Sequence, residues 1–149
     1  MNKNSLKERA LLLLVLTAII LILVAILIFA VYSLKSLDFM DIRISSTSSV
    51  FAFTVLLMLG TGALSVIGSI LDSLRRHLFK DSFKFGGMVI QEVLLIILFG
   101  GMIYWIDQWV SGVEIGNIQT EFLLVLFLYG LITLLGKLGN QIKKRDEEQ

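Results

Sequence analysis

The sequence predicts an all-α membrane protein with four transmembrane helices, in one domain that spans residues 1–149. Three observations support this fold class. Hydrophobic residues make up 56% of the chain, they gather in long uncharged runs rather than on one helix face, and most Lys and Arg residues fall on one side of these runs. Because the chain has no cysteine, it has no disulfide and no thiolate metal site.

Four runs approach the roughly 20 apolar residues that a helix needs to cross a bilayer core. The first span, 10–34, is uncharged and too long for the core of a signal peptide. The second, 49–71, is also uncharged and begins among serines. The third, 87–107, contains Glu92. The fourth, 119–138, has a shorter charge-free core at 122–136 and reaches full length only with its polar neighbours.

The positive charges predict the orientation, because Lys and Arg accumulate in cytoplasmic loops. Eleven of the thirteen fall on one side of a four-span arrangement: Lys3, Lys7, Arg9, Arg75, Arg76, Lys80, Lys84, Lys137, Lys143, Lys144 and Arg145. Only Lys35 and Arg43 fall on the other side. We therefore expect a multi-pass protein of the cell membrane with both termini in the cytoplasm.

The two predicted outer connections resemble each other. Residues 42–44 and 113–115 both alternate apolar and polar side chains, which is typical of a short strand. An offset of 71 in the numbering superposes them, places Ser49 on Thr120, and lays the first span on the third and the second on the fourth. One interpretation is chance similarity between hydrophobic segments. The other is a 2+2 parallel repeat about an axis along the membrane normal, with the two extracytoplasmic strands paired.

One face of the second span carries small hydroxyl side chains. Thr61, Ser65 and Ser69 follow one another at every fourth position. Small residues allow two helix backbones to approach closely, so we interpret this face as an intramolecular packing surface. A homodimer seam and a permeation path remain as alternatives. Asp72 and Arg76, with the same spacing, support a helix that continues beyond the membrane.

Glu92 is the ionisable residue that the third span carries below the membrane surface. Such residues are costly and often functional. Glu92 lies about one turn inside the inner end, where its side chain can reach the interface, and Arg75, Arg76 and Lys84 are candidate partners. We favour an intramembrane ion pair with a structural role, and keep a functional role as the alternative.

A basic segment connects the second and third spans. Arg75, Arg76, Lys80 and Lys84 lie there among leucines and phenylalanines, a mixture that suits contact with anionic lipid or with a partner protein. The chain has no phosphate-binding loop, nucleophile elbow or zinc-protease motif. We therefore expect no enzyme, no catalytic or metal-binding residue, no cofactor and no direct nucleic-acid contact.

Two stretches and the four-span layout carry a resemblance to a known family. The first is the serine-rich connection into Phe51, with the basic stretch 74–80 beyond that span. The second is 106–115, followed by Thr120 and Glu121. On these residues the chain resembles the YrvL-type regulatory membrane proteins of spore-forming Gram-positive bacteria. The resemblance implies a negative regulator of an alternative sigma factor system, which acts from the membrane and has no catalytic residues.

Three classes of function remain open. A regulator needs a membrane anchor and a cytoplasmic contact surface, and its partners would be membrane lipids and a cytoplasmic regulatory protein. A small transporter or channel needs ionisable residues deep in the bundle, for which Glu92 is the candidate. An accessory subunit of a membrane complex, or a homo-oligomer, needs only packing faces. The family resemblance favours the regulator.

Overall fold

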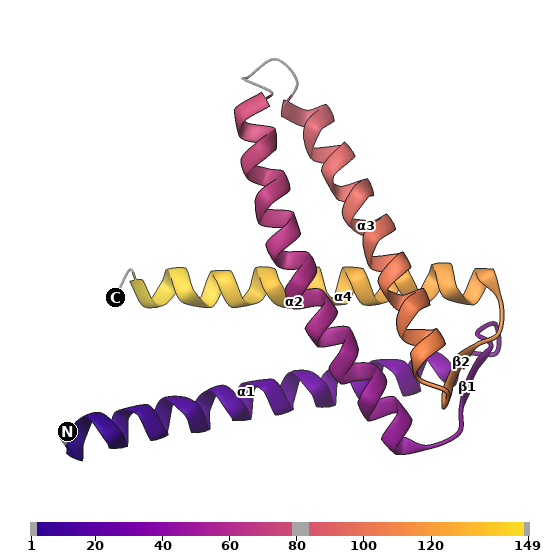
Figure 1. Ribbon diagram of the computed structural model, residues 1–149, viewed down its shortest axis with the longest axis horizontal. Helices are drawn as coiled ribbons and strands as arrows, with labels where there is room; N and C mark the ends of the chain where they lie inside the picture. Colours follow the sequence, from indigo (N-terminus) through magenta and orange to yellow (C-terminus); the bar gives the residue numbers. More distant parts are fainter. Residues whose placement is uncertain (1–2, 79–83, 148–149) are drawn as a thin grey trace.

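Long uncharged runs without proline form four helices, and two strands connect them (Figure 1). The computed structural model describes residues 3–78 and 84–147. In chain order the elements are α1 (Lys3–Lys35), β1 (Ile42–Ile44), α2 (Thr47–Leu78), α3 (Lys84–Trp109), β2 (Val113–Ile115) and α4 (Ile118–Glu147). All four helices are long and apolar enough to cross a membrane. The chain is therefore a multi-pass membrane protein, as predicted, and its helices extend beyond the predicted spans.

The two strands form an antiparallel ribbon, which confirms the predicted pairing. Ile42 lies opposite Ile115, Arg43 opposite Glu114, and Ile44 opposite Val113. The Arg43 side chain nevertheless pairs with Asp41 rather than with Glu114, at 3.5 Å between Nε and Oδ1. Both of these side chains are exposed, so the ion pair contributes little to stability.

Backbone hydrogen bonds around the ribbon obey the predicted offset of 71. The Ser45 N–H donates to the Gly112 carbonyl at 2.9 Å, and the Gly116 N–H donates to the Asp41 carbonyl at 2.8 Å. Ser45 is the repeat equivalent of Gly116, and Asp41 is the repeat equivalent of Gly112. The two hydrogen bonds are therefore equivalent to each other. This equivalence is what a two-fold axis through the ribbon produces.

The starts of α2 and α4 obey the same offset. The Ser49 N–H donates to Ser46 Oγ at 3.2 Å, and the Thr120 N–H donates to Asn117 Oδ1 at 2.7 Å. Each is a helix N-cap, in which a short polar side chain satisfies an otherwise unpaired backbone donor. Ser49 and Thr120 thus hold equivalent places in α2 and α4, as the predicted offset requires, and the caps themselves are Ser46 and Asn117. Figure 1 shows α1 and α3 running toward the ribbon, and α2 and α4 running away from it.

The first helix of each half follows an offset of 72 rather than 71. The buried residues of α1 and α3 correspond in this register: Leu27 with Phe99, Val31 with Ile103, and Leu34 with Ile106. The path from the buried Leu34 to Ile42 therefore has one residue more than the equivalent path from Ile106 to Val113. Since one residue rotates a helix face by about 100°, the predicted offset of 71 would have turned the wrong face of α1 inward.

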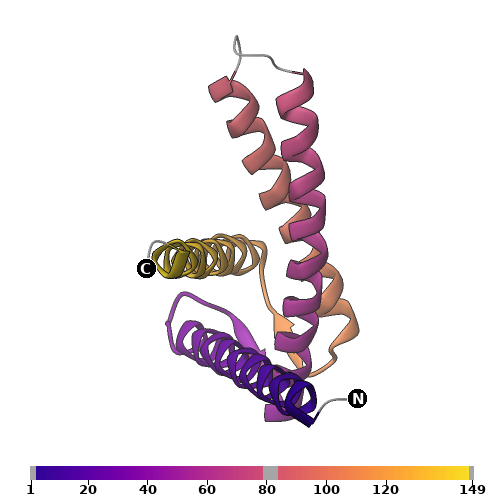
Figure 2. The ribbon, with the colours of Figure 1, turned by 90° about the vertical axis from the view of Figure 1, so that its left-hand side faces the viewer.

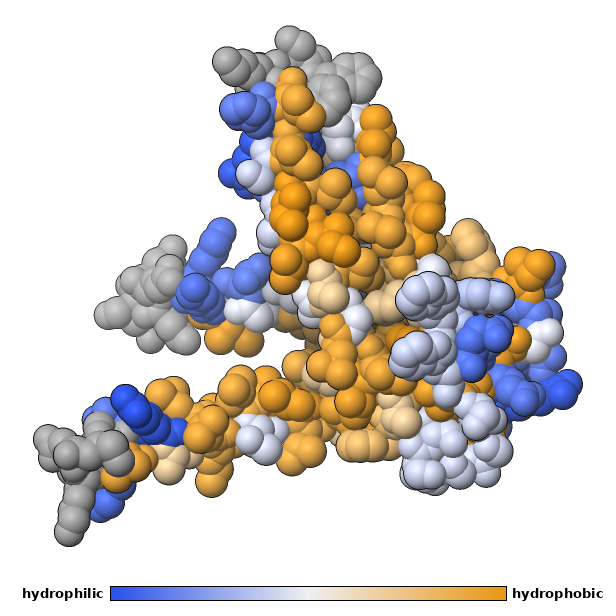
Figure 3. All heavy atoms as spheres, in the orientation of Figure 1, coloured by the Kyte–Doolittle hydropathy of each residue, from blue (hydrophilic) through white to orange (hydrophobic). Residues whose placement is uncertain are grey.

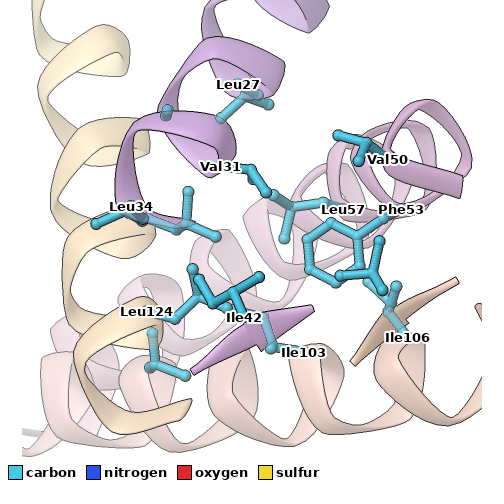
Figure 4. Close-up of a cluster of buried hydrophobic side chains, with 14 of the residues drawn as sticks. Leu27, Val31, Leu34, Ile42, Val50, Phe53, Leu57, Ile103, Ile106 and Leu124 are labelled. Atoms are coloured by element: carbon cyan, nitrogen blue, oxygen red, sulfur yellow. The ribbon is translucent and has the colours of Figure 1, made fainter. Parts of the chain in front are cut away.

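The core lies beside the ribbon and takes side chains from all four helices and both strands (Figure 4). Its fully buried members include Val31, Val50, Phe53, Leu57, Phe99, Ile103, Val113, Leu124 and Leu128. Farther from the ribbon the apolar side chains face outward, and Leu12 is 69% exposed. Lipid tails are as apolar as leucine, so this exposure suits a membrane.

The helices converge at the ribbon and spread apart at their other ends. In Figures 1 and 2, α2 and α3 leave the ribbon as a hairpin in one direction, while α1 and α4 extend in another. Contacts are most extensive between α2 and α3. We call the two sides of the molecule the ribbon end and the open end. Figure 3 shows hydrophilic residues at the ribbon and at the far ends of the helices, with hydrophobic surface between them.

Gly112 provides a test of the ribbon. A methyl group there would lie 1.9 Å from Ser49 Oγ and 2.4 Å from its Cβ, so the turn and the α2 cap cannot both keep their positions. We expect Gly112→Ala to destabilise the protein by about 1–3 kcal/mol, which is typical of overpacking, measured as a lower midpoint of thermal unfolding in detergent. Gly62→Ala is the matched control, because nothing lies within 4 Å of its added methyl group. Equal midpoints for the two variants would contradict this account of the ribbon.

Candidate functional site

A polar cleft of about 570 Å³ lies between α2, α3 and α4. It opens on the side of the core away from the ribbon. Its polar lining residues are Thr61, Ser65, Ser69, Asp72, Gln91, Glu92, Tyr129 and Asn140. Polar and ionisable groups within membrane helices are costly and mark functional sites. We therefore treat this polar cleft as the candidate site.

The hydroxyl face of α2 forms one wall of the polar cleft. Thr61 Oγ1 donates to the Leu57 carbonyl at 2.7 Å, and Ser69 Oγ donates to the Ser65 carbonyl at 3.0 Å. Such bonds to the preceding helical turn satisfy hydroxyl groups without a partner helix. Ser65 and Ser69 are exposed to the cleft.

The close packing that we expected at Thr61, Ser65 and Ser69 occurs instead on an adjacent face of α2. A Cβ atom added to Gly68 would lie 3.7 Å from Leu95, and one added to Gly60 would lie 2.1 Å from Met102 Sδ. The two glycines therefore let α3 approach α2 closely. The hydroxyl residues one position away are left to face the polar cleft.

Glu92 joins α3 to α4 across the polar cleft. Its Oε2 accepts a hydrogen bond from the Tyr129 hydroxyl at 2.6 Å. The Tyr129 ring packs edge-on against Phe99, with ring centroids 5.6 Å apart and planes at 68°. Tyr129 is thereby held by packing on one side and orients the carboxylate on the other.

Two of the three predicted partners of Glu92 form ion pairs elsewhere. Arg75 and Arg76 both bind Asp72, one turn away on α2, and the Arg76 contact is 2.8 Å. The spacing of Asp72 and Arg76 thus supports the end of α2, as predicted. The third candidate partner, Lys84, begins α3, and its side chain lies outside the described residues.

The structure describes part of the predicted basic contact segment. The α2 helix continues to Leu78, so Arg75 and Arg76 lie on its last turn. The Arg76 side chain is 77% exposed and the Arg75 side chain 19%. Lys80 lies outside the described residues, as does the side chain of Lys84. Contact of this segment with lipid or protein stays a prediction.

Gln91 carries an unusual acceptor. Its Nε2 atom lies at the limit of hydrogen-bond distance from the Gly68 carbonyl, at 3.5 Å. Its Oε1 atom is buried and has no hydrogen-bond partner among the described residues. A buried acceptor without a partner loses its hydration without compensation. An unpaired group of this kind needs an explanation.

The repeat supplies an internal comparison for the polar cleft. A second pocket of about 280 Å³ lies between α1, α2 and α4, and each of its seven lining residues is the repeat equivalent of a cleft residue. In α1 and α3 the equivalents are Leu23 with Leu95 and Leu27 with Phe99; in α2 and α4 they are Met58 with Tyr129, Thr61 with Ile132, Ile132 with Thr61, Leu135 with Leu64, and Gly136 with Ser65. The second pocket is therefore the apolar counterpart of the polar cleft.

The polar residues of the cleft belong to one half of the repeat. Where the polar cleft has Gln91, Glu92 and Tyr129, the other half has Ile19, Ile20 and Met58. Ile19 and Ile20 are about half exposed on α1, whereas α3 packs along α2. The two halves therefore differ both in polarity and in packing at these positions.

The polar cleft ends before it reaches the ribbon. The core separates them with side chains from several helices, and Leu57, Phe99 and Leu128 are each at most 2% exposed. Within the described residues the cleft is thus a blind site that is accessible from the open end. This geometry suits binding from one side rather than conduction through the bundle.

The sequence alone singled out only part of this site. Thr61, Ser65, Ser69 and Glu92 were predicted, but as parts of a packing face and an ion pair. Gln91, Tyr129 and Asn140 were missed, although each is a polar residue within or beside an apolar run. A comparison of the two repeat halves would have found Gln91 and Tyr129, since their equivalents are aliphatic or Met.

Comparison with known proteins gives no relative from which a function can be transferred. No family model, no curated protein and no solved structure matches the chain. The resemblance to the YrvL-type family stays a prediction.

Proposed function

We propose that this protein is a regulator in the cell membrane, with both termini and the open end in the cytoplasm, and that it acts through protein contacts on that side. The observation that carries the proposal is where the polar groups lie. The polar cleft and the exposed Arg76 are found at the open end, whereas the core closes the ribbon end. A signal that enters and leaves on one side needs no path across the membrane.

The regulated system follows from the sequence resemblance. It favours negative regulation of an alternative sigma factor system, with a cytoplasmic protein of that system as the partner. The contact surface in this proposal is the basic segment of Arg75, Arg76, Lys80 and Lys84, and membrane lipids surround the helices. The distribution of Lys and Arg supports the orientation that this requires.

A small transporter is the second candidate, and one observation favours it. Glu92 is an ionisable residue in a polar cleft among membrane helices, which is the kind of residue that binds transported ions. The closed ribbon end argues against it. Transport would need a second arrangement in which the core beside the ribbon opens.

The regulator proposal is tested by transcript profiling of a strain that lacks the gene. We expect transcripts of one sigma factor's target genes to rise, and to return to the parental level when the gene is restored. Unchanged transcript levels in the deletion strain would refute the regulator proposal.

Topology is tested with single cysteines, which are unambiguous because the chain has none of its own. In intact cells, an impermeant thiol reagent should leave Ser82→Cys and Gln149→Cys unlabelled and should label Ser111→Cys, which is exposed beside the ribbon. Permeabilised cells provide the control, since all three cysteines should then react. Labelling of Ser82→Cys in intact cells would overturn the four-span orientation.

A further inference from the structure

We propose that the polar cleft binds a primary ammonium group, with Glu92 as its counter-ion. Such a group is present in the phosphatidylethanolamine headgroup and in small soluble amines. The inference rests on which hydrogen-bonding groups the cleft has already used and which remain available. It deepens the proposed function by naming a signal for the regulator.

Four of the donors around the polar cleft are directed at acceptors within the protein. The Tyr129 hydroxyl donates to Glu92 at 2.6 Å, and the Gln91 amide nitrogen lies 3.5 Å from the Gly68 carbonyl. The hydroxyl groups of Thr61 and Ser69 donate to carbonyl groups of their own helix. A ligand that needs donors from the protein is left with Ser65 and Asn140, whose oxygen atoms can equally accept hydrogen bonds.

The acceptors, in contrast, are not saturated by donors of the protein. Gln91 Oε1 is buried and has no partner among the described residues. The Glu92 carboxylate accepts one bond from Tyr129 and has room for about three more. The second carboxylate of the lining, Asp72, is already bound by two arginines. Among the side chains that the structure describes, no Lys or Arg pairs with Glu92.

A cleft wall with unsaturated acceptors and a carboxylate that no described cation pairs with favours a cation that donates several hydrogen bonds. A primary ammonium group has three N–H donors and no acceptor, as in lysine. A quaternary ammonium group has the charge but no donor. Divalent metal ions prefer several carboxylates, and the described residues contain no group of three or more His, Cys, Asp or Glu residues that could hold a metal ion.

The position and size of the polar cleft fit both sources of the ligand. From Glu92 to its end at Trp109, the α3 helix is about 25 Å long. With the ribbon end outside, this depth is close to the cytoplasmic headgroups of a bilayer core about 30 Å thick. A cleft of about 570 Å³ has room for an aminoethyl group and the phosphate beside it.

Purified protein in two settings tests the inference. In nanodiscs, phosphatidylglycerol mixed with phosphatidylethanolamine is compared with phosphatidylglycerol mixed with phosphatidylcholine, whose headgroup has no N–H. In delipidated detergent micelles, butylamine is compared with tetramethylammonium at equal concentration and pH. We expect a higher midpoint of thermal unfolding with phosphatidylethanolamine than with phosphatidylcholine, or with butylamine than with tetramethylammonium. The expected difference is about 5 °C at 100 times the half-saturating concentration.

Two variants and one matched control assign the effect to the site. Glu92→Gln keeps the shape and the bond from Tyr129 but removes the charge, and should weaken binding about tenfold or more, as expected for a lost charged hydrogen bond. Gln91→Leu removes the unpartnered acceptor and keeps a side chain of similar length. It should also weaken binding. Glu114→Gln removes a carboxylate on β2, at the ribbon, and should leave binding unchanged.

The outcomes separate the two sources and the two proposals. Stabilisation by phosphatidylethanolamine alone identifies a lipid ligand, and stabilisation by butylamine identifies a soluble one. The site is refuted if phosphatidylethanolamine stabilises the protein no more than phosphatidylcholine and butylamine no more than tetramethylammonium. It is also refuted if Glu92→Gln binds as well as the parent protein. Because binding is measured on purified protein, its failure does not depend on the transcript profiles that test the regulator.

Discussion

Replacing Arg75, Arg76 and Lys80 together by glutamine is expected to raise the regulated transcripts to the level seen in a strain that lacks the gene. Arg76 is 77% exposed on the last turn of α2, so its guanidinium group is accessible to a partner. Arginine binds carboxylates through two parallel hydrogen bonds, which glutamine cannot reproduce. The measurement is transcript profiling in cells that produce the variant in place of the parent protein.

Two controls make this result specific. The triple variant leaves Asp72 without its two partners, whereas Asp72→Asn breaks the same ion pairs and keeps every positive charge. Asp72→Asn should therefore retain regulation if the positive charges bind the partner. Removing three positive charges also weakens the bias that orients the protein, so labelling of Ser82→Cys must be checked in the same cells.

The triple variant also distinguishes the regulator from the transporter. A transporter would depend on Glu92 and would be little affected by changes at the end of α2. An effect confined to Glu92→Gln, with normal transcripts in the triple variant, would favour transport. Loss of regulation in the triple variant with correct insertion would favour the regulator.

Phe53→Ala is expected to cause the largest loss of stability among the predictions for the fold. Phe53 is fully buried beside the ribbon, among residues of the core (Figure 4). In a membrane, moving an apolar side chain from lipid into protein contributes little, because lipid tails are equally apolar. The cost of the empty space remains, and for a phenylalanine it is about 2–3 kcal/mol.

Phe51→Ala is the matched control, because Phe51 lies on the same turn of α2 and is 50% exposed. Its removal leaves a surface that lipid can fill, so we expect little change. Unfolding by sodium dodecyl sulfate in mixed micelles measures both variants against the parent protein. Similar unfolding midpoints for Phe51→Ala and Phe53→Ala would show that the core beside the ribbon does not hold the helices together.

The sequence by itself determined the helices and the ribbon. These features depend on residues close together in the chain: uncharged runs long enough for a bilayer, and alternation at 42–44 and 113–115. The offset of 71 also predicted which strand residues pair. The offset of 71 does not hold for α1 and α3, whose buried residues follow an offset of 72. Only the buried faces of these two helices reveal the extra residue.

Only the tertiary structure decided what the polar residues do. Glu92 meets Tyr129 where α3 lies beside α4, and Gln91 faces Gly68 on α2. Neither the position where two helices meet nor the rotation of a helix is encoded in a local pattern. One residue along a helix rotates the side chain by about 100°. Gly68 therefore packs against α3 while its neighbour Ser69 faces the polar cleft. Arg75 and Arg76 bind Asp72 on their own helix, and Glu92 meets a tyrosine from α4 in place of an arginine from α2.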